Sequence, residues 1–228
     1  MFLKWYRSKC IKVVQTFLLI GLSVSQVEAS PRKPLPALLK EVEAKYAKAA
    51  TLSAEFSQVT EDAILSKKKN STGKILIKRP AKVRWETLSP DKNLLVSDGK
   101  KYWYYTPPFE EGERGQVIEK NSSSVQSKLA NSLLSGAFSV NRDMTIQQKG
   151  ASTFLLTPKP GTAGTVIQAI VEIDSQSKLI QKVTLNHKGG NRAEITLSQI
   201  QLGEVLGDEV FTFKAPPNTD QVDEFVGK

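Results

Sequence analysis

Cysteine and histidine are almost absent from this chain of 228 residues, which contains one of each, Cys10 and His187. A single cysteine excludes a disulfide framework within the chain, and one cysteine with one histidine cannot form a zinc site of the cysteine and histidine type. His187 is the only candidate for an imidazole base, and no G-x-S-x-G sequence marks a nucleophile. Because His187 precedes Lys188-Gly189-Gly190, an exposed turn residue is its simpler interpretation. We expect no catalytic residue, no metal ion and no cofactor.

A hydrophobic run long enough to span a membrane is also lacking. The uncharged stretch from Val13 to Val27 is shorter than the roughly 20 residues that a membrane anchor needs, and it contains Gln and Ser. Four basic residues precede it, and Val27-Glu28-Ala29 places small residues before a cleavage point. This pattern predicts a signal peptide over residues 1–29, cleaved near Ala29. Cys10 precedes the apolar stretch, so it does not match a lipoprotein acylation site.

The excess of positive charge has no strong local concentration. The formal net charge is +9, and removal of residues 1–29 takes away four bases and one acid, which leaves +6. The only basic run, Lys67 to Lys69, is expected on a loop between strands. A nucleic-acid site would combine a basic stripe with aromatic residues, so we expect no nucleic-acid partner. A mildly basic surface is compatible with weak attraction to anionic lipid headgroups.

The periodicity of apolar residues predicts one helix followed by many strands. Apolar residues at spacings of three and four predict a helix over Pro36 to Ala50, and a second helix is expected over Val125 to Ser135. Alternation and turn residues predict the strands, which are 52–57, Lys74–Arg79, Lys82–Thr87, Asn93–Ser97, Lys101–Thr106, Asp143–Gln148, Ser152–Thr157, Thr165–Asp174, Lys178–Asn186, Arg192–Gln201 and Val210–Phe213. The fold class is therefore mainly β, with a large antiparallel sheet that is curled or closed.

Two strands carry aromatic side chains whose distribution over the two faces is informative. Residues 102–105 read Tyr-Trp-Tyr-Tyr, so both faces of that strand are aromatic. Val83 and Trp85 share one face of another strand. A sheet with few helices to cover it must close on itself or hold a ligand. Ordinary core packing remains the alternative for any single residue.

Several short motifs are specific in combination. They are Phe56-Ser57-Gln58, Lys78-Arg79-Pro80, Val83-Arg84-Trp85, Leu95-Val96-Ser97-Asp98-Gly99-Lys100, Trp103-Tyr104-Tyr105 with Pro107, Leu133-Leu134-Ser135-Gly136, Phe154-Leu155-Leu156-Thr157-Pro158-Lys159, Phe211-Thr212-Phe213 and Pro216-Pro217. In this order, together with a cleavable signal and no acylation cysteine, they resemble the periplasmic outer-membrane lipoprotein carrier family, LolA. The resemblance covers nearly the whole region after residue 29.

The resemblance implies a fold and a function. The fold is an unclosed antiparallel β-barrel of about ten or eleven strands, formed by residues 30–228, with an N-terminal helix and lid helices over an apolar concave face. Its function is that of a periplasmic chaperone rather than an enzyme. It is expected to act as a monomer that carries acylated lipoproteins from an inner-membrane ABC transporter to an outer-membrane receptor.

The resemblance also implies which residues form the site. Arg79 matches the arginine that fastens the lid, and a guanidinium keeps its charge when partly buried. The expected acyl-chain-binding residues are Val83, Trp85, Val96, Trp103, Tyr105, Leu133 and Leu134. If the register of a strand differs by one residue, all of the residues named from that strand lie on the other face of the sheet.

Three alternatives remain open from the sequence. A receptor of the same fold should carry an acylation cysteine after its signal peptide. A related half-barrel that binds another lipid or senses envelope stress is the second alternative. A secreted hydrolase would need a catalytic pair around His187.

Overall fold

The computed structural model describes residues 35–121, 133, 136–138 and 144–222, and these described residues belong to one compact unit. The described part contains one α-helix, twelve strands and one 3₁₀ helix. In chain order they are α1 (Ala37–Ala47), β1 (Thr51–Asp62), β2 (Lys67–Lys78), β3 (Lys82–Ser89), β4 (Asn93–Asp98), β5 (Lys101–Thr106), β6 (Gly115–Asn121), β7 (Met144–Gln148), β8 (Thr153–Pro158), β9 (Val166–Ile173), β10 (Ile180–His187), β11 (Arg192–Leu202), η1 (Asp208–Phe211) and β12 (Thr219–Gln221). The signal peptide and its cleavage point lie outside the described residues.

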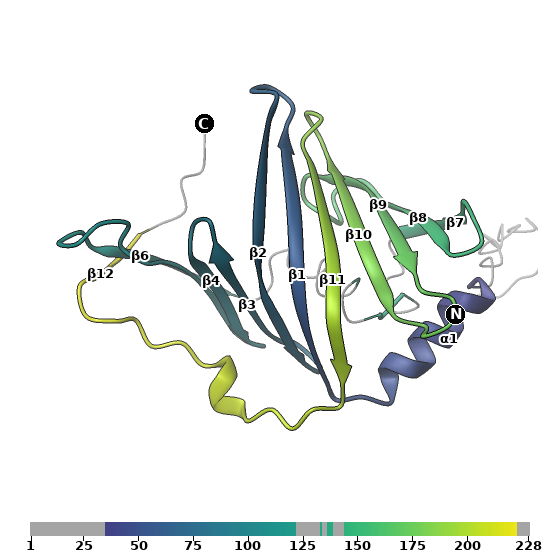
Figure 1. Cartoon of the computed structure of the whole chain (residues 1–228), viewed down its shortest axis with the longest axis horizontal. Helices are drawn as coiled ribbons and strands as arrows, with labels where there is room; N and C mark the ends of the chain where they lie inside the picture. The colour runs from purple at the N-terminus through teal and green to yellow at the C-terminus, as the bar shows by residue number, and fades with distance from the viewer. Residues whose placement is uncertain (1–34, 122–132, 134–135, 139–143, 223–228) are drawn as a thin grey trace, which may run out of the picture. The chain divides into compact units, whose positions relative to one another are not determined.

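All twelve strands belong to a single open sheet (Figure 1). Their order is β12-β6-β5-β4-β3-β2-β1-β11-β10-β9-β8-β7. Every neighbouring pair is antiparallel except β12 with β6. The two terminal strands of this order, β12 and β7, are not paired with each other. The prediction of a mainly β, unclosed antiparallel architecture is confirmed, with two strands, β6 and β12, that the sequence patterns did not reveal.

Two local predictions were wrong. The lysine run at Lys67 was expected in a loop, but it begins β2, because the backbone of Lys67 to Lys69 pairs with that of Thr60 to Asp62. The segment around Val210 was expected to be a strand, but it forms η1, which turns the Phe211 side chain into a fully buried position. The expected helix over Val125 to Ser135 lies outside the described residues except for Leu133.

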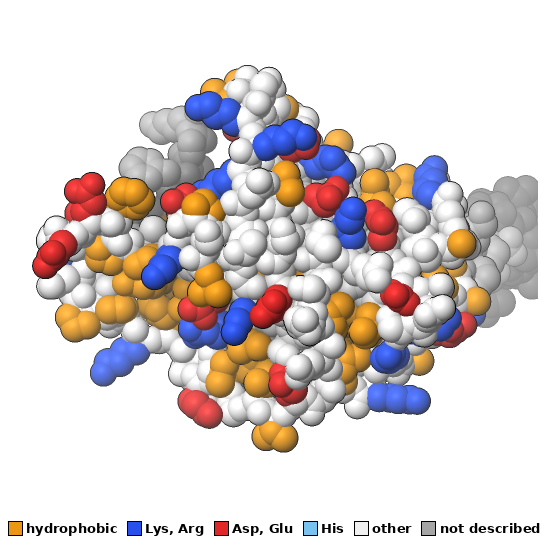
Figure 2. Space-filling view, viewed as in Figure 1, with side chains coloured by type: hydrophobic (Ala, Val, Ile, Leu, Met, Phe, Trp, Pro, Cys, Tyr) orange, Lys and Arg blue, Asp and Glu red, His pale blue; other side chains and the backbone are white. Residues whose placement is uncertain are grey.

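The strand register divides the sheet into two faces. Directly opposed residues share a face, and successive residues alternate. Phe56, Ile75 and Trp85 therefore lie on one face, which we call the inner face. Glu61 lies on the outer face together with Lys68 and Arg192, which are directly opposite it. Figure 2 shows basic and acidic side chains beside one another over the long central strands.

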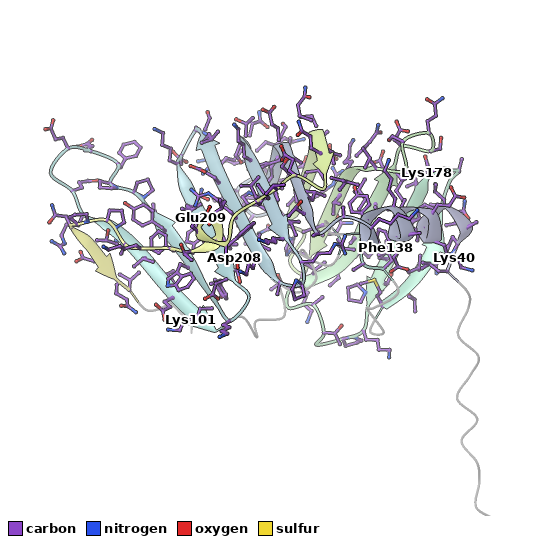
Figure 3. All side chains as sticks on the ribbon, turned by 90° about the horizontal axis from the view of Figure 1, so that it is seen from below. Lys40, Lys101, Phe138, Lys178, Asp208 and Glu209 are labelled. Carbon is purple, nitrogen blue, oxygen red and sulfur yellow. The ribbon has the colours of Figure 1, made fainter. Side chains whose placement is uncertain are left out.

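Helix α1 covers part of the inner face and completes its core. Its apolar side buries Leu39, Val42 and Tyr46 among side chains of β1, β2 and β8 to β11. The Tyr46 hydroxyl accepts a hydrogen bond of 3.0 Å from the backbone N–H of Ile180, and its burial raises its pKa to about 12. The Lys178 ammonium lies 2.8 Å from a carboxylate oxygen of Glu41. These contacts fix α1 against the β9–β10 turn, and Figure 3 shows Lys178 near this helix.

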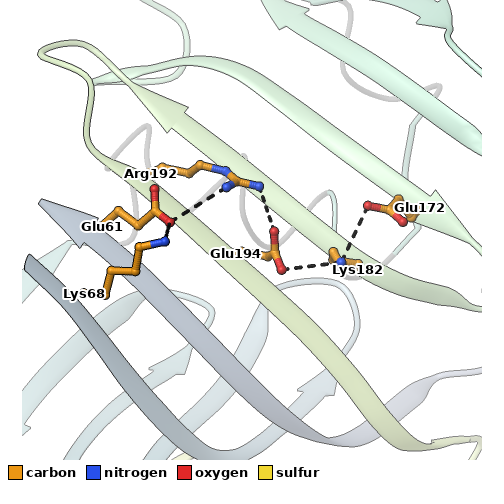
Figure 4. Close-up of polar contacts among 6 residues, drawn as sticks. All are labelled: Glu61, Lys68, Glu172, Lys182, Arg192 and Glu194. Carbon is orange, nitrogen blue, oxygen red and sulfur yellow. Dashed lines mark hydrogen bonds and ion pairs between the residues drawn. The ribbon is translucent and has the colours of Figure 1, made fainter. Parts of the chain in front are cut away.

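A series of ion pairs crosses the outer face from β2 to β9 (Figure 4). Glu61 lies 2.7 Å from Lys68 and 4.0 Å from Arg192. Glu194 then lies 2.7 Å from Arg192 and 3.4 Å from Lys182. Exposed pairs of this kind contribute little to stability individually. They do show that this part of the outer face is polar.

Candidate functional site

A groove of about 290 Å³ lies on the inner face, across strands β1 to β5. The register places Trp85 opposite Leu95, and Leu95 opposite Tyr104. These three side chains from β3, β4 and β5 form the apolar floor. The complete lining is Gln58, Thr60, Lys69, Ser71, Trp85, Thr87, Asp91, Asn93, Leu95 and Tyr104. The volume is near the lower end of the range for small-molecule sites.

The groove has an apolar and a polar part. At the apolar end the Trp85 ring packs against Phe56, with ring centroids 4.8 Å apart and planes tilted by 51°. At the polar end the Gln58 amide donates to the Thr60 hydroxyl at 2.9 Å, and the Lys69 ammonium lies 2.6 Å from Asp91. A ligand with a hydrocarbon chain and a polar linkage matches this division, because each part meets surface of its own kind.

The five strand residues expected to form one acyl-facing wall lie on two faces. Val83 and Trp85 are on the inner face. Val96 pairs with Arg84 and Trp103, and these residues are on the outer face together with Tyr105. The expected set is therefore separated, because neighbouring residues of a strand point in opposite directions.

Leu95 and Tyr104 line the groove and were missed by sequence reasoning. A signal for their pairing was present. The Asp98-Gly99 turn fixes Ser97 opposite Tyr102, and counting back along both strands places Leu95 opposite Tyr104. The turn does not determine which face of the sheet is covered, so the pattern alone does not distinguish Leu95 and Tyr104 from the adjacent Val96 and Trp103.

The outer aromatic residues are covered by the chain's own C-terminal segment. The Phe213 ring lies 5.4 Å from that of Tyr105 and 6.3 Å from that of Trp103, measured between centroids. The Trp103 indole N–H donates to the Glu119 carboxylate at 2.9 Å. Val96 is fully buried under the same segment, which contacts β3 and β4 through η1. This packing explains why aromatic residues occupy both faces of β5.

Asp208 holds the C-terminal segment against the outer face, and Figure 3 shows it where that segment crosses the sheet. Its two carboxylate oxygens lie 2.7 Å from the Lys78 ammonium and 2.8 Å from the Lys82 ammonium. These hydrogen bonds lower the pKa of Asp208 to about 2. An unfolded aspartate has a pKa of about 4. The carboxylate therefore stabilises the folded chain above about pH 4, and this contribution is lost as the pH falls through about 2.

We expect Asp208→Asn to lower Tm by the same amount from pH 7 to about pH 4, and by progressively less as the pH falls from about 4 to 2. Calorimetry of both proteins across this range measures the difference. Glu209→Gln, in the same 3₁₀ helix, is the control variant. A difference in Tm that stays constant from pH 7 to pH 2 would show that the Asp208 charge does not act in this way.

Arg79 lies immediately after β2 and binds the chain that follows α1. Its backbone N–H donates to the Ala50 carbonyl at 2.9 Å, and its Nε–H donates to the Ala49 carbonyl at 3.2 Å. Partial burial lowers the pKa of the guanidinium. Leu133 is buried in the inner core with α1, and Leu134 lies outside the described residues. The structure thus places Arg79 beside the chain that leaves α1, the helix that covers part of the inner face.

Among the described residues that line the inner groove there is no histidine and no cysteine. His187 ends β10, and its Nδ1 lies 2.9 Å from the Thr165 hydroxyl. Burial lowers the pKa of this imidazole. Within the described ranges, no group of histidine, cysteine, aspartate and glutamate side chains is arranged to hold a metal ion. No helix of the same ranges combines the length and apolar character needed to cross a membrane.

Comparison with known proteins places the chain in a family. The family model described as outer membrane lipoprotein carrier protein LolA matches residues 47–214. The outer-membrane lipoprotein carrier protein of Pseudomonas paraeruginosa is 30% identical over 179 residues, covering 78% of this chain and 83% of that protein. The protein of the same name from Azotobacter vinelandii is 27% identical over 215 residues, covering 92% and 100%. A solved structure of a LolA superfamily protein from Nitrosomonas europaea has 11% identity and a TM-score of 0.44, covering 77% of this chain and 96% of that one. The chain belongs to the LolA family of outer membrane lipoprotein carrier proteins.

Proposed function

We propose that this chain is a periplasmic chaperone that shields the acyl chains of lipoproteins during their transfer to the outer membrane. The observation that carries the proposal is the groove on the inner face, with Trp85, Leu95 and Tyr104 as an apolar floor beside a polar wall. The family of the chain is the second support, because its relatives are named outer-membrane lipoprotein carrier proteins.

The physical need for such a carrier follows from the hydrophobic effect. Each methylene group removed from water contributes about 0.8 kcal/mol, so a protein with several long acyl chains does not diffuse freely through water. A groove that remains partly open offsets much of this cost and still permits release. Transfer then requires only an acceptor that binds the cargo more tightly than the carrier does.

The complete proposal includes the partners and the place of action. Residues 1–29 direct export and are removed near Ala29, and residues 30–228 act as one monomeric domain in the periplasm. An inner-membrane ABC transporter supplies the cargo, and an outer-membrane receptor accepts it. The chain binds and releases cargo without catalysing a reaction. Val83, Trp85, Leu95 and Tyr104 bind acyl chains from the sheet, and Leu133 and Leu134 complete the site.

A release assay tests this function. Vesicles that contain the transporter and a labelled lipoprotein are incubated with ATP and purified residues 30–228. Soluble complexes of one carrier with one lipoprotein in the supernatant are the expected result. If the transporter hydrolyses ATP and no lipoprotein is released, the carrier role is wrong. Mass spectrometry of the ligand that copurifies would then test the alternative of a general lipid-binding or stress-sensing half-barrel.

We further propose that Arg79 is the latch that keeps α1, the helix that covers part of the inner face, in its closed position. Its bonds to the carbonyls of Ala49 and Ala50 join the end of β2 to the chain after α1. Arg79→Leu removes the charged side-chain donor, and we expect the rate of cargo transfer to the receptor to change roughly tenfold. Arg84→Leu, which removes an arginine paired with Glu86 on the outer face, is the matched control. Transfer by Arg79→Leu at the wild-type rate would refute the latch.

A further inference from the structure

The turn at the end of the β1–β2 hairpin exposes two aliphatic side chains that do not line the groove. Ile64 is 87% exposed and Leu65 is 61% exposed, at the turn between β1 and β2. Burying such side chains would release a favourable hydrophobic contribution that the isolated chain does not gain. Single exposed aliphatic residues are common, but two adjacent ones at a projecting turn form a compact apolar point.

The turn is held in a fixed shape that keeps these side chains outward. One carboxylate oxygen of Asp62 accepts the backbone N–H groups of Ile64 and Leu65, at 2.9 and 2.8 Å. The Ala63 N–H donates to the Asn191 side chain at 3.0 Å, which ties the turn to the β10–β11 turn. Figure 1 shows the two hairpin ends side by side. The apolar point is therefore ordered before any partner binds.

Lysines surround the apolar point. Lys67 to Lys69 follow it directly in β2, and Lys188 lies in the neighbouring β10–β11 turn. Lys68 pairs with Glu61, and Lys69 pairs with Asp91. The ammonium groups of Lys67 and Lys188 have no ion pair or hydrogen bond within the described part of the chain, so both are available to an external anion. In Figure 2 hydrophobic and basic side chains gather at this end of the hairpin.

We propose that Ile64, Leu65, Lys67 and Lys188 form a docking point for a bilayer that contains anionic lipids. The aliphatic pair enters the interface, and the two free ammonium groups lie at the level of the lipid phosphates. Each lysine near an anionic membrane surface increases partitioning about fivefold. A projecting turn offers far less area than the roughly 800 Å² that each partner buries in a stable protein–protein interface. Shape and charge together therefore favour a lipid surface over a protein surface.

The position of the docking point relates it to the groove. Gln58, Thr60, Lys69 and Ser71 of the same hairpin form the polar wall of the groove. Docking through the hairpin end brings that wall toward the headgroup region, and it shortens the path of an acyl chain through water. The docking point itself needs no cargo, so it stands independently of the carrier role.

Vesicle binding without cargo tests the proposal. Purified residues 30–228 are sedimented with vesicles of phosphatidylcholine containing about one-third phosphatidylglycerol, and with vesicles of phosphatidylcholine alone. We expect binding to the anionic vesicles that weakens with salt. Ile64→Ser with Leu65→Ser is expected to lower the partition coefficient roughly tenfold. Lys67→Gln with Lys188→Gln is expected to lower it about 25-fold, on anionic vesicles only.

Phe109→Ser is the matched control, because Phe109 is 84% exposed in the β5–β6 loop, away from this hairpin. Equal melting curves confirm that all variants are folded. The proposal is overturned if wild-type protein does not bind anionic vesicles, if the Ile64 and Leu65 variant binds as well as wild type, or if Phe109→Ser loses as much binding. It is also overturned if Leu95→Asp abolishes vesicle binding, since lipid uptake into the groove would then explain the signal.

Discussion

Replacement of Leu95 by aspartate is expected to lower the affinity of the chain for an acyl ligand about a hundredfold or more. Leu95 lies between Trp85 and Tyr104 on the apolar floor of the groove. A carboxylate at this position stays hydrated only if the acyl chain stays out, and burying it without a partner costs several kcal/mol. A loss of about 2.7 kcal/mol already corresponds to a hundredfold weaker complex. Fluorescence titration with a labelled diacyl lipopeptide measures this affinity.

The position of Leu95 makes the experiment specific to the groove. Because the Leu95 side chain is only half-buried, an aspartate there can reach water, and the fold should persist. Leu88→Asp introduces the same charge next to Thr87 but on the outer face, where Leu88 is 44% exposed, and we expect its affinity to match wild type. If Leu95→Asp bound the lipopeptide as tightly as wild type, the acyl chains would have to lie elsewhere.

Replacement of Gly73 by alanine is expected to destabilise the chain by about 1–3 kcal/mol and to disturb the apolar end of the groove. Gly73 lies in β2 opposite Phe56 of β1 and Thr87 of β3. A Cβ atom at Gly73 would lie 1.9 Å from the Glu86 carbonyl oxygen and 2.7 Å from Cε1 of Phe56. The backbone of β3 or the Phe56 ring must therefore shift, and the contact of Phe56 with Trp85 shifts with it.

Urea unfolding measures the loss of stability, and near-ultraviolet circular dichroism reports the environment of the aromatic rings. Gly150→Ala is the control, because a Cβ atom there would meet only the Thr153 side chain, at an ordinary 3.7 Å. We expect this control to change stability by less than about 0.5 kcal/mol. Equal stability of Gly73→Ala and wild type would show that the close approach is not a constraint on the fold.

Local patterns predicted most of the strands, because the alternation of apolar and polar residues and the turn residues between strands are signals that extend over only a few positions. The hairpin at Asp98-Gly99 is an example, since Asp98 accepts the backbone N–H groups of Lys100 and Lys101 within its own turn. The same reasoning failed for Lys67, because pairing with β1 outweighs the low strand preference of lysine. It failed for Val210 because burial of Phe211 and the bonds of Asp208 to two lysines of distant strands favour a 3₁₀ turn.

The sequence by itself determined the class of fold, the family resemblance and the presence of aromatic residues on both faces of β5. Only the tertiary structure decided which side chains line the inner groove. Trp85 and Leu95 face the groove because α1 packs on their side of the sheet, against Ile75 and its neighbours. Trp103 and Tyr105 are removed from it because Phe213, more than 100 residues later, covers them. The pleat is the same on both sides, so the choice of face depends on which distant segment covers each one.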